Sequence, residues 1–338
     1  MTSFFVYKIT FINTFVKKQK NIHKKNEIKY TQIGDNMDKI KIGIPRSLYY
    51  YYFSELYINF FKYLDCEVVI SPPTNKEIMK LGNDNSVDEM CLSLKNYIGH
   101  IVYLKDKVDY IVIPRIDNYG ISNQTCTNFL SLYDIISNLV DTKILNYNIC
   151  LSNAETEYKG FLKMGKQLDK KRKEIKNAYL RSKIEHNNKL DKQIRNNMHN
   201  LLSKKIKILL IGHPYNLYDE LVGKPIIKYL EKNNIEIIYS DKFDNIKTNE
   251  LSYNLSKECY FKYNKENIGS IELCKGMIDG IIFLTSFPCG PDSLVNELVI
   301  RKINIPYLNL IIDDLDSNVG LITRLESFID ILKMRRKQ

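Results

Sequence analysis

The sequence lacks any pair of cysteines separated by two residues, and it lacks a long apolar run. Without a Cys-x-x-Cys pair, the usual zinc-binding and thioredoxin-like sites are not expected. No segment approaches the roughly 20 apolar residues that span a bilayer, so we expect no membrane-embedded part. We also expect no secretory signal, because the apolar residues near the start precede the basic cluster instead of following it.

Seven cysteines are present, an odd number spread widely over 338 residues. A disulfide framework is therefore not expected, and this cysteine usage favours a reducing, cytoplasmic setting. The 44% apolar and 26% charged fractions are those of a globular chain. The length leaves room for two domains, each with its own core.

The formal net charge of +11 suggests nucleic-acid binding at first sight, but the charge is unevenly distributed. Lys17–Lys29 has a balance of +5 and Lys163–Lys207 one of +11, so the rest of the chain nets −5. The parts that read as folded modules are thus mildly acidic. We expect neither a nucleic-acid nor a membrane partner, and a DNA binder stays a third hypothesis resting on the two basic stretches.

Short apolar strands alternate with helical segments from Met37 onward. This pattern predicts an α/β fold of two doubly wound, mostly parallel-sheet modules joined by a long charged helical connector. We expect a non-core leader at 1–36, a first module at 37–158, the connector at 159–204 and a second module at 205–338 with a C-terminal helix. The leader could instead be an amphipathic surface anchor.

The expected elements follow from apolar periodicity and from turn residues. The expected strands are Ile40–Ile44, Glu67–Ile70, Val108–Ile113, Ile206–Ile211, Ile235–Tyr239, Ile281–Thr285 and the region around Tyr307–Ile312. The expected helices are Tyr49–Leu64, Asn75–Leu81, Glu89–Leu104, Leu130–Leu139, Val222–Lys232, much of Ser256–Lys275, Pro291–Arg301 and Gly320–Lys333.

Three cysteines share one type of position, the loop between a strand and the following helix. Cys91 begins a helix after a Gly/Asn/Asp loop, Cys126 follows the third expected strand, and Cys289 sits in a Pro-Cys-Gly-Pro turn. Such loops converge on one crevice when two α/β modules face each other, and a helix N-terminus lowers the pKa of a nearby thiol. Three thiolates there would suit a [4Fe-4S] cluster with one iron open to substrate or water.

Each of these cysteines could instead be a small buried residue, as free cysteines often are. The remaining four fall on apolar faces of expected elements, and we expect them in the core. They are Cys66, Cys150, Cys259 and Cys274.

Three arginines are candidates for binding an anion or a substrate. Arg46 and Arg115 each follow a proline that ends a strand, where a guanidinium could clamp a carboxylate or phosphate or could form a salt bridge. Arg324, with Thr323, is expected at the start of the last helix, where the pair could cap the helix or meet an anion.

Acid and proton-donor candidates lie near the cysteines in sequence. Glu89, beside Cys91, could act as an acid near an open iron or could simply complement a helix dipole. His100 lies on the helix after Cys91 and His213 lies in a strand-end turn; each could be a proton donor or a structural histidine.

Seven sequence blocks stand in a fixed order: GIPRSLYYYY, SPPTNKEIMKLG, DEMCLSLKNYIGHIVYL, VDYIVIPRI, GHPYNLYDE, DGIIFLTSFPCGPDSLVNELV and TRLESFIDIL. In that order and at those distances, from about Met37 to Lys333, they resemble the acyl-CoA dehydratase activase-related family. That family is kin to the D-component subunits of 2-hydroxyacyl-CoA dehydratases and related reductases.

The resemblance implies a [4Fe-4S] cluster held by Cys91, Cys126 and Cys289. It implies that the partner is an ATP-hydrolysing activase, which delivers one electron at low potential. It also implies acyl-CoA-type chemistry, in which the chain would act as a lyase or as a reductase component. Whether the chain assembles with itself or with another subunit stays open.

The sequence departs from the family pattern at two places. Leu92 and Thr127 stand where proline usually follows the first two cysteines, and Asp313–Asp316 lacks the expected histidine. These departures keep open an alternative function, a non-catalytic binding or regulatory module that retains the fold.

Overall fold

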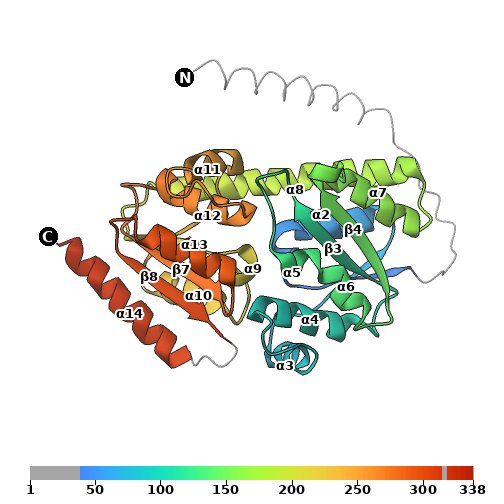
Figure 1. Cartoon of the computed structure of the whole chain (residues 1–338), viewed down its shortest axis with the longest axis horizontal. Coiled ribbons are helices and arrows are strands. Elements are labelled where there is room, and N and C mark those ends of the chain that lie inside the picture. The colour runs from blue at the N-terminus through green and yellow to red at the C-terminus, as the bar shows by residue number, and fades with distance from the viewer. Residues whose placement is uncertain (1–38, 314–317, 338) are drawn as a thin grey trace, which may run out of the picture. The chain divides into compact units, whose positions relative to one another are not determined.

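The computed structural model describes residues 39–313 and 318–337 (Figure 1). The chain divides into two units, Met1–Asp38 and Lys39–Gln338. The first unit, with the expected leader, lies outside the described residues. Within the described ranges, no helix has the length and apolar character that crossing a membrane requires.

The first sheet has four parallel strands in the order β2-β1-β3-β4. Its strands are β1 (Lys41–Ile44), β2 (Glu67–Ile70), β3 (Tyr110–Asn118) and β4 (Lys143–Cys150). The helices that follow them are α2 (Tyr50–Tyr63), α3 (Lys76–Asp84), α4 (Leu92–Leu104), α5 (Thr127–Leu130), α6 (Leu132–Ser137) and α7 (Glu157–Gln167).

Aromatic side chains of α2 fill one side of the first core. Tyr57 and Phe60 are buried, and their ring centroids lie 6.1 and 4.8 Å from that of Phe161 in α7. In Figure 1, α2 and α7 lie on one side of the sheet, whereas α3 and α4 lie on the other. The sheet is thus covered on both faces, as an all-parallel sheet requires.

The second sheet has the order β6-β5-β7-β8, and all its strands are parallel. Its strands are β5 (Lys207–Ile211), β6 (Glu236–Tyr239), β7 (Gly280–Ser286) and β8 (Tyr307–Ile312). Its helices are α9 (Pro214–Leu217), α10 (Lys224–Lys232), α11 (Asn245–Ser252), α12 (Lys262–Leu273), α13 (Gly290–Ile300) and α14 (Asn318–Arg335). Every residue of β7 is buried, because separate apolar clusters cover its two faces.

The two sheets share one topology, and particular contacts recur in both. The backbone N–H of Lys41 donates to Asp109 Oδ2 at 2.8 Å, and that of Lys207 donates to Asp279 Oδ2 at 2.7 Å. Both contacts tie the start of a module's first strand to the residue just before its third strand. The predicted α/β fold of two parallel-sheet modules is therefore confirmed, and the second module is a structural repeat of the first.

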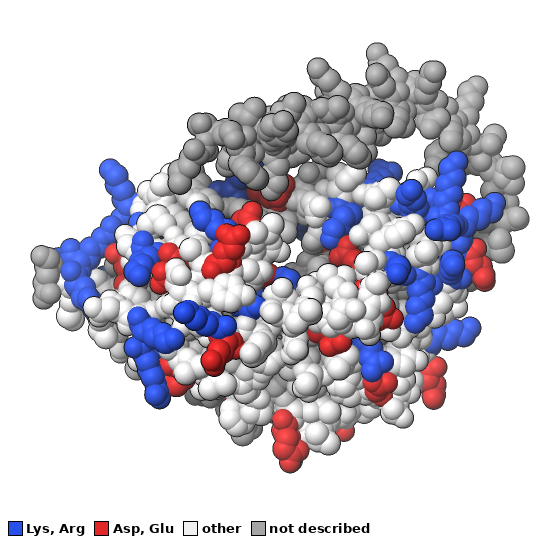
Figure 2. Space-filling view, turned by 45° about the horizontal axis from the view of Figure 1, so that its top comes forward, with Lys and Arg blue, Asp and Glu red and all other residues white. Residues whose placement is uncertain are grey.

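The charged segment between the sheets forms two helices, α7 and the 29-residue α8 (Arg172–Asn200). α8 packs on α2 and reaches β6, where the Asn197 side chain accepts from Tyr239 N and donates to Tyr239 O. Figure 2 shows lysines and arginines interspersed with acidic side chains over the face it presents, not one unbroken basic surface. The exact module boundaries at 158 and 204 stay predictions.

Two eight-residue elements, β4 and α11, were not expected from the sequence, and neither were the four-residue helices α5 and α9. β4 reads Lys-Ile-Leu-Asn-Tyr-Asn-Ile-Cys, so asparagines interrupt its apolar run, yet the strand pairs with β3 along its whole length. α11 has almost no apolar periodicity, and it begins where Asp244 Oδ1 accepts from the N–H groups of Ile246 and Lys247. Tertiary pairing and capping, rather than periodicity, define these two elements.

Candidate functional site

Three thiols from different loops line one cavity of about 70 Å³. Cys91 and Cys126 come from the first module and Cys289 from the second. Each is the N-cap residue of a helix, respectively of α4, α5 and α13, and each has extended backbone angles. The structure therefore brings together the three cysteines that the sequence singled out, at the carboxyl edges of both sheets.

A buried hydroxyl and amide cluster joins the loops that carry Cys91 and Cys289. Ser93 Oγ and Ser286 Oγ each lie within 2.8 Å of Asn216 Oδ1, and the two hydroxyl oxygens are 2.8 Å apart. The backbone N–H of Leu92 also donates to the carbonyl oxygen of Phe287 at 2.9 Å. Because all three side chains are buried, these bonds fix the two cysteine loops relative to each other.

Asp292, in the first turn of α13, is an acidic residue of the cavity lining and accepts several hydrogen bonds. Its Oδ1 accepts from His213 Nε2 at 2.9 Å and from Asn264 Nδ2 at 2.8 Å. Burial alone would raise the pKa of this carboxyl, but the charge of His213 and hydrogen bonds from His213, Asn264 and Cys289 outweigh burial and lower it. Asp292 thus stays ionised while it orients Cys289.

Aromatic rings close the cavity on the side of His213. The His213 ring stacks on Tyr215 with centroids 4.9 Å apart, and its Nδ1 lies 3.2 Å from the hydroxyl of Tyr52. Tyr263 and Phe129 complete this wall. The surroundings of the thiols therefore combine this aromatic wall with neutral polar side chains and one buried carboxylate, that of Asp292.

The thiols do not have the lowered pKa expected of cysteines at helix N-termini. Burial is the largest effect on Cys91, Cys126 and Cys289 and raises the pKa of all three, and the nearby Asp292 carboxylate raises each further. Backbone N–H groups of the helix ends act in the opposite direction without overcoming burial. That expectation was wrong in sign, because desolvation outweighs the helix end here.

Within the described residues, no group of three or more His, Cys, Asp or Glu side chains could hold a single metal ion. A polynuclear cluster differs, because its thiolates bind different iron atoms and lie farther apart than the ligands of one ion. Three soft sulfur donors are the set that iron–sulfur clusters use. The donor chemistry thus fits a cluster, and a mononuclear zinc-type site is not preformed.

Several other candidates lie away from the cavity. Glu89 is exposed and does not line it, although it is two residues from Cys91. Arg115 donates to Leu130 O and forms an ion pair with Asp134 at 3.0 Å, the salt-bridge alternative. The Arg46 guanidinium lies 5.7 Å from the centre of the Tyr50 ring.

Arg324 lies inside α14 instead of at its start, because the helix begins at Asn318. The capping alternative for Thr323 and Arg324 is therefore wrong, and the anion-binding alternative stays a prediction. Arg324 donates to the carbonyl oxygen of Asn309 and lines a separate cavity between α3, α4 and α14.

The four cysteines expected in the core, Cys66, Cys150, Cys259 and Cys274, are buried.

His100 is fully buried in α4 and does not line the cysteine cavity. Its Nε2 lies 3.1 Å from Thr74 Oγ1, whose hydroxyl donates to Asp219 of the second module. Burial, and secondarily the charge of Arg46, lower the pKa of His100 to about 3 from 6.5. In this structure the imidazole is part of the contact between the modules.

His100 should make stability depend on pH. Between pH 6.5 and 3 the His100 imidazole binds a proton in the unfolded chain but not in the folded protein. The contribution of His100 to the free energy of unfolding is therefore fully present above pH 6.5 and decreases as the pH falls. We expect the difference in unfolding free energy between wild type and His100→Gln to shrink by about 2 kcal/mol from pH 7 to pH 5. Urea unfolding at both pH values measures it, and parallel pH profiles would contradict it.

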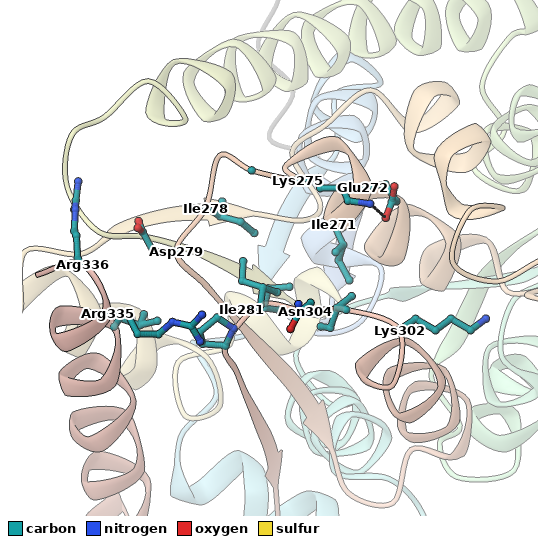
Figure 3. A pocket seen from close by; sticks show the side chains of 15 residues that line it. Ile271, Glu272, Lys275, Ile278, Asp279, Ile281, Lys302, Asn304, Arg335 and Arg336 are labelled. Atoms are coloured by element: carbon teal, nitrogen blue, oxygen red, sulfur yellow. Dashed lines mark ion pairs between the residues drawn. The ribbon is translucent and has the colours of Figure 1, made fainter. Parts of the chain in front are cut away.

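Three larger cavities lie elsewhere, and one of them, of about 700 Å³, is the cavity lined by Arg324. A cavity of about 780 Å³ lies under α8 and shares only the Tyr263 wall with the cysteine cavity. Its half-buried lysines, Lys242 and Lys262, pair with Asp241 and Glu266. A cavity of about 480 Å³ lies at the amino edge of the second sheet (Figure 3).

The cavity of Figure 3 has an isoleucine-rich floor and charged residues around it. Most of these charges are already engaged: Lys275 pairs with Glu272, Lys302 donates to Leu255 O, and Arg336 donates to Lys204 O. It lies at the sheet edge opposite the cysteines. The thiol-lined cavity, although smaller, is therefore the candidate site.

Sequence reasoning missed Asp292, Asn264 and Phe261 as parts of this site. Asp292 read only as a helix-start residue, and Asn264 and Phe261 lie in a helical segment without a motif. Asn264 and Phe261 also line the cavity, but they are far from Cys91, Cys126 and Cys289 along the chain, which hides their proximity to the thiols. Only the Asp-Ser pair after Cys289 carried a usable signal, an acid in the first turn after a thiol.

Comparison with known proteins gives one family and one weak structural likeness. No curated protein matches the chain. The crystal structure of a sugar transporter from Clostridium phytofermentans is 13% identical over 88% of this chain and 93% of that chain, with a TM-score of 0.21, and carries no argument about fold or function.

A family described as the CoA enzyme activase uncharacterised domain matches residues 41–243, more than half of the chain. The matched range contains Cys91 and Cys126 and ends before Cys289. It runs through the first module, α8 and the first two strands of the second sheet. The resemblance found in the sequence is thereby confirmed, and the chain belongs to this CoA enzyme activase-related family.

Proposed function

We propose that Cys91, Cys126 and Cys289 hold a [4Fe-4S] cluster between the two modules, and that the protein takes part in low-potential electron transfer to acyl-CoA-type chemistry. The observation that carries this proposal is the meeting of three N-cap thiols, from both modules, at one cavity. Membership of a CoA enzyme activase-related family supports the chemistry. When bound, such a cluster supplies one-electron transfer at low potential.

The protein's own residues would prepare and protect this cluster. Because burial raises the pKa of the three thiols, cluster binding would have to release their protons. The ionised Asp292 next to Cys289 orients that thiol. The Ser93–Asn216–Ser286 cluster holds two of the three cysteine loops in register. The aromatic wall limits access of water.

The partner we propose is an ATP-dependent activase that delivers the electron, in the cytoplasm. The substrate class is an acyl-CoA, with the chain acting as a lyase or as a reductase component. Glu89 and His100 stay predicted catalytic residues, but their positions outside the cavity lend them no support.

Anaerobic reconstitution of the full chain with ferrous iron and sulfide tests the proposal. We expect a four-iron cluster with the absorbance of a [4Fe-4S] protein, and an EPR signal that develops only when a cognate activase, ATP and a reductant are all present. A protein that takes up no cluster would refute the proposal. A cluster that the activase leaves oxidised would refute only the electron-transfer part.

The alternative is a non-catalytic module that keeps the fold. It is favoured by Leu92, which stands where the family has proline and is buried in the apolar cluster of the second module. Under this alternative the activase still binds in a pull-down, but no acyl-CoA is converted. Substrate turnover by the reconstituted protein would exclude it.

A further inference from the structure

The apolar stripe of α14 ends in an arginine. Three residues recur at helical spacing on this stripe and are buried, Leu325, Phe328 and Leu332. Arg335 takes the next position of the same stripe. A Cβ atom on Gly280, the first residue of β7, would lie 2.9 Å from Phe328 Cζ and 3.0 Å from Leu332 Cδ1. The helix is thus packed closely against the start of β7, and Arg335 comes next, at the amino edge of the sheet.

Arg335 lines the cavity of about 480 Å³ at this edge, and in Figure 3 its side chain extends over the floor toward Ile281. Ile281 is fully buried, whereas three other isoleucines of the lining are only half-buried, Ile278, Ile303 and Ile305. The floor therefore presents branched aliphatic side chains that the protein covers incompletely. The volume is in the range of pockets that hold small organic ligands.

The cavity lining contains four basic and two acidic side chains. Both acidic groups are held by the protein, because Glu272 pairs with Lys275 and Asp279 Oδ2 accepts from the backbone N–H of Lys207. Three of the basic groups are engaged as well, namely Lys275, Lys302 and Arg336. Among the described residues, the structure shows no hydrogen bond or ion pair for the guanidinium of Arg335.

We propose that this cavity binds an aliphatic monocarboxylate, with the carboxylate on Arg335 and the chain on the isoleucine floor. A guanidinium presents paired N–H donors that match the two oxygens of a carboxylate. An aliphatic chain would cover the apolar surface that the half-buried isoleucines leave open. The excess of basic groups favours an anion over a neutral or cationic amphiphile. The site is independent of the proposed function, because it lies at the sheet edge opposite the cysteines and needs no cluster.

Titration calorimetry of the full chain with butanoate, hexanoate and octanoate tests this inference. We expect the Kd to fall about fourfold for each CH₂ group that the floor covers. Arg335→Gln should weaken octanoate binding at least about tenfold, because the carboxylate loses its charged donor. Octan-1-ol, which has the same chain without the charge, should bind wild type and Arg335→Gln equally.

Lys333→Gln is the matched control for the charge. Lys333 is exposed, lies two residues from Arg335 in α14, pairs with Asp330 at 3.6 Å and does not line the cavity. The substitution removes the same charge from the same end of the helix. It should therefore leave the Kd for octanoate as in the wild type.

The outcomes are distinct. Wild-type protein that binds no octanoate, a Kd that does not change with chain length, or equal weakening in Arg335→Gln and Lys333→Gln would each overturn the inference. Chain-length dependence together with weakening only in Arg335→Gln supports it. Because no iron is added in these titrations, either result leaves the proposed cluster to its own test.

Discussion

Replacement of Cys289 by alanine should lower the iron and sulfide bound after anaerobic reconstitution by at least about tenfold. Cys289 is the only thiol that the second module contributes to the cavity, so its loss leaves two ligands, both from the first module. The Asp292 carboxylate, which Cys289 contacts, would also lose that partner. Iron and sulfide analysis, with absorbance and EPR spectra, measures the effect.

Cys66→Ala is the matched control for this experiment. Cys66 is a buried cysteine of the first module that donates to Leu64 O and does not line the cavity. It should leave the cluster content unchanged. Equal cluster content in Cys289→Ala and Cys66→Ala would show that the thiol-lined cavity is not the binding site.

Gly99→Ala should destabilise the protein by about 1–3 kcal/mol. The added methyl group would lie 2.0 Å from the Ile78 carbonyl oxygen and 3.0 Å from the Gly82 nitrogen, so α3 and α4 must separate. Backbone atoms on both sides cannot move as a flexible side chain would. Urea unfolding followed by circular dichroism measures the cost. Gly269→Ala should have a similar cost, because a Cβ atom there would lie 1.8 Å from the carbonyl oxygen of Thr248.

Gly320→Ala is the control for this substitution, because no heavy atom lies within 4 Å of a Cβ placed there. Since Gly320 is an exposed residue of α14, alanine should stabilise the protein by up to about 1 kcal/mol through helix propensity. If Gly99→Ala proved as stable as Gly320→Ala, the close approach of α3 and α4 would be wrong.

The fold could be predicted where apolar runs are continuous. The strands at Ile281–Thr285 and Tyr307–Ile312 were expected because nearly every residue there is apolar, and both elements form. β4 was missed because Asn146 and Asn148 break its pattern, and only pairing with β3 makes it a strand. Local periodicity does not contain such long-range pairing.

The candidate site was predictable in its thiols and not in its other members. Cys91, Cys126 and Cys289 share a loop type that sequence can recognise. The role of Asp292 depends on its contacts with His213 and Asn264, which are far from it along the chain, so no local pattern records them. The sign of the thiol pKa shift also required the structure, because burial depends on the aromatic residues packed around the cavity.

The three thiols are far apart along the chain, and this affects how the protein matures. Cys289 is made 198 residues after Cys91. The cavity that they share exists only after both modules have folded and met. Under the proposed function, a cluster held by all three thiols can form only after Cys289 has been made, and a nascent chain that stops before the last two strands would leave Cys91 and Cys126 without their third partner.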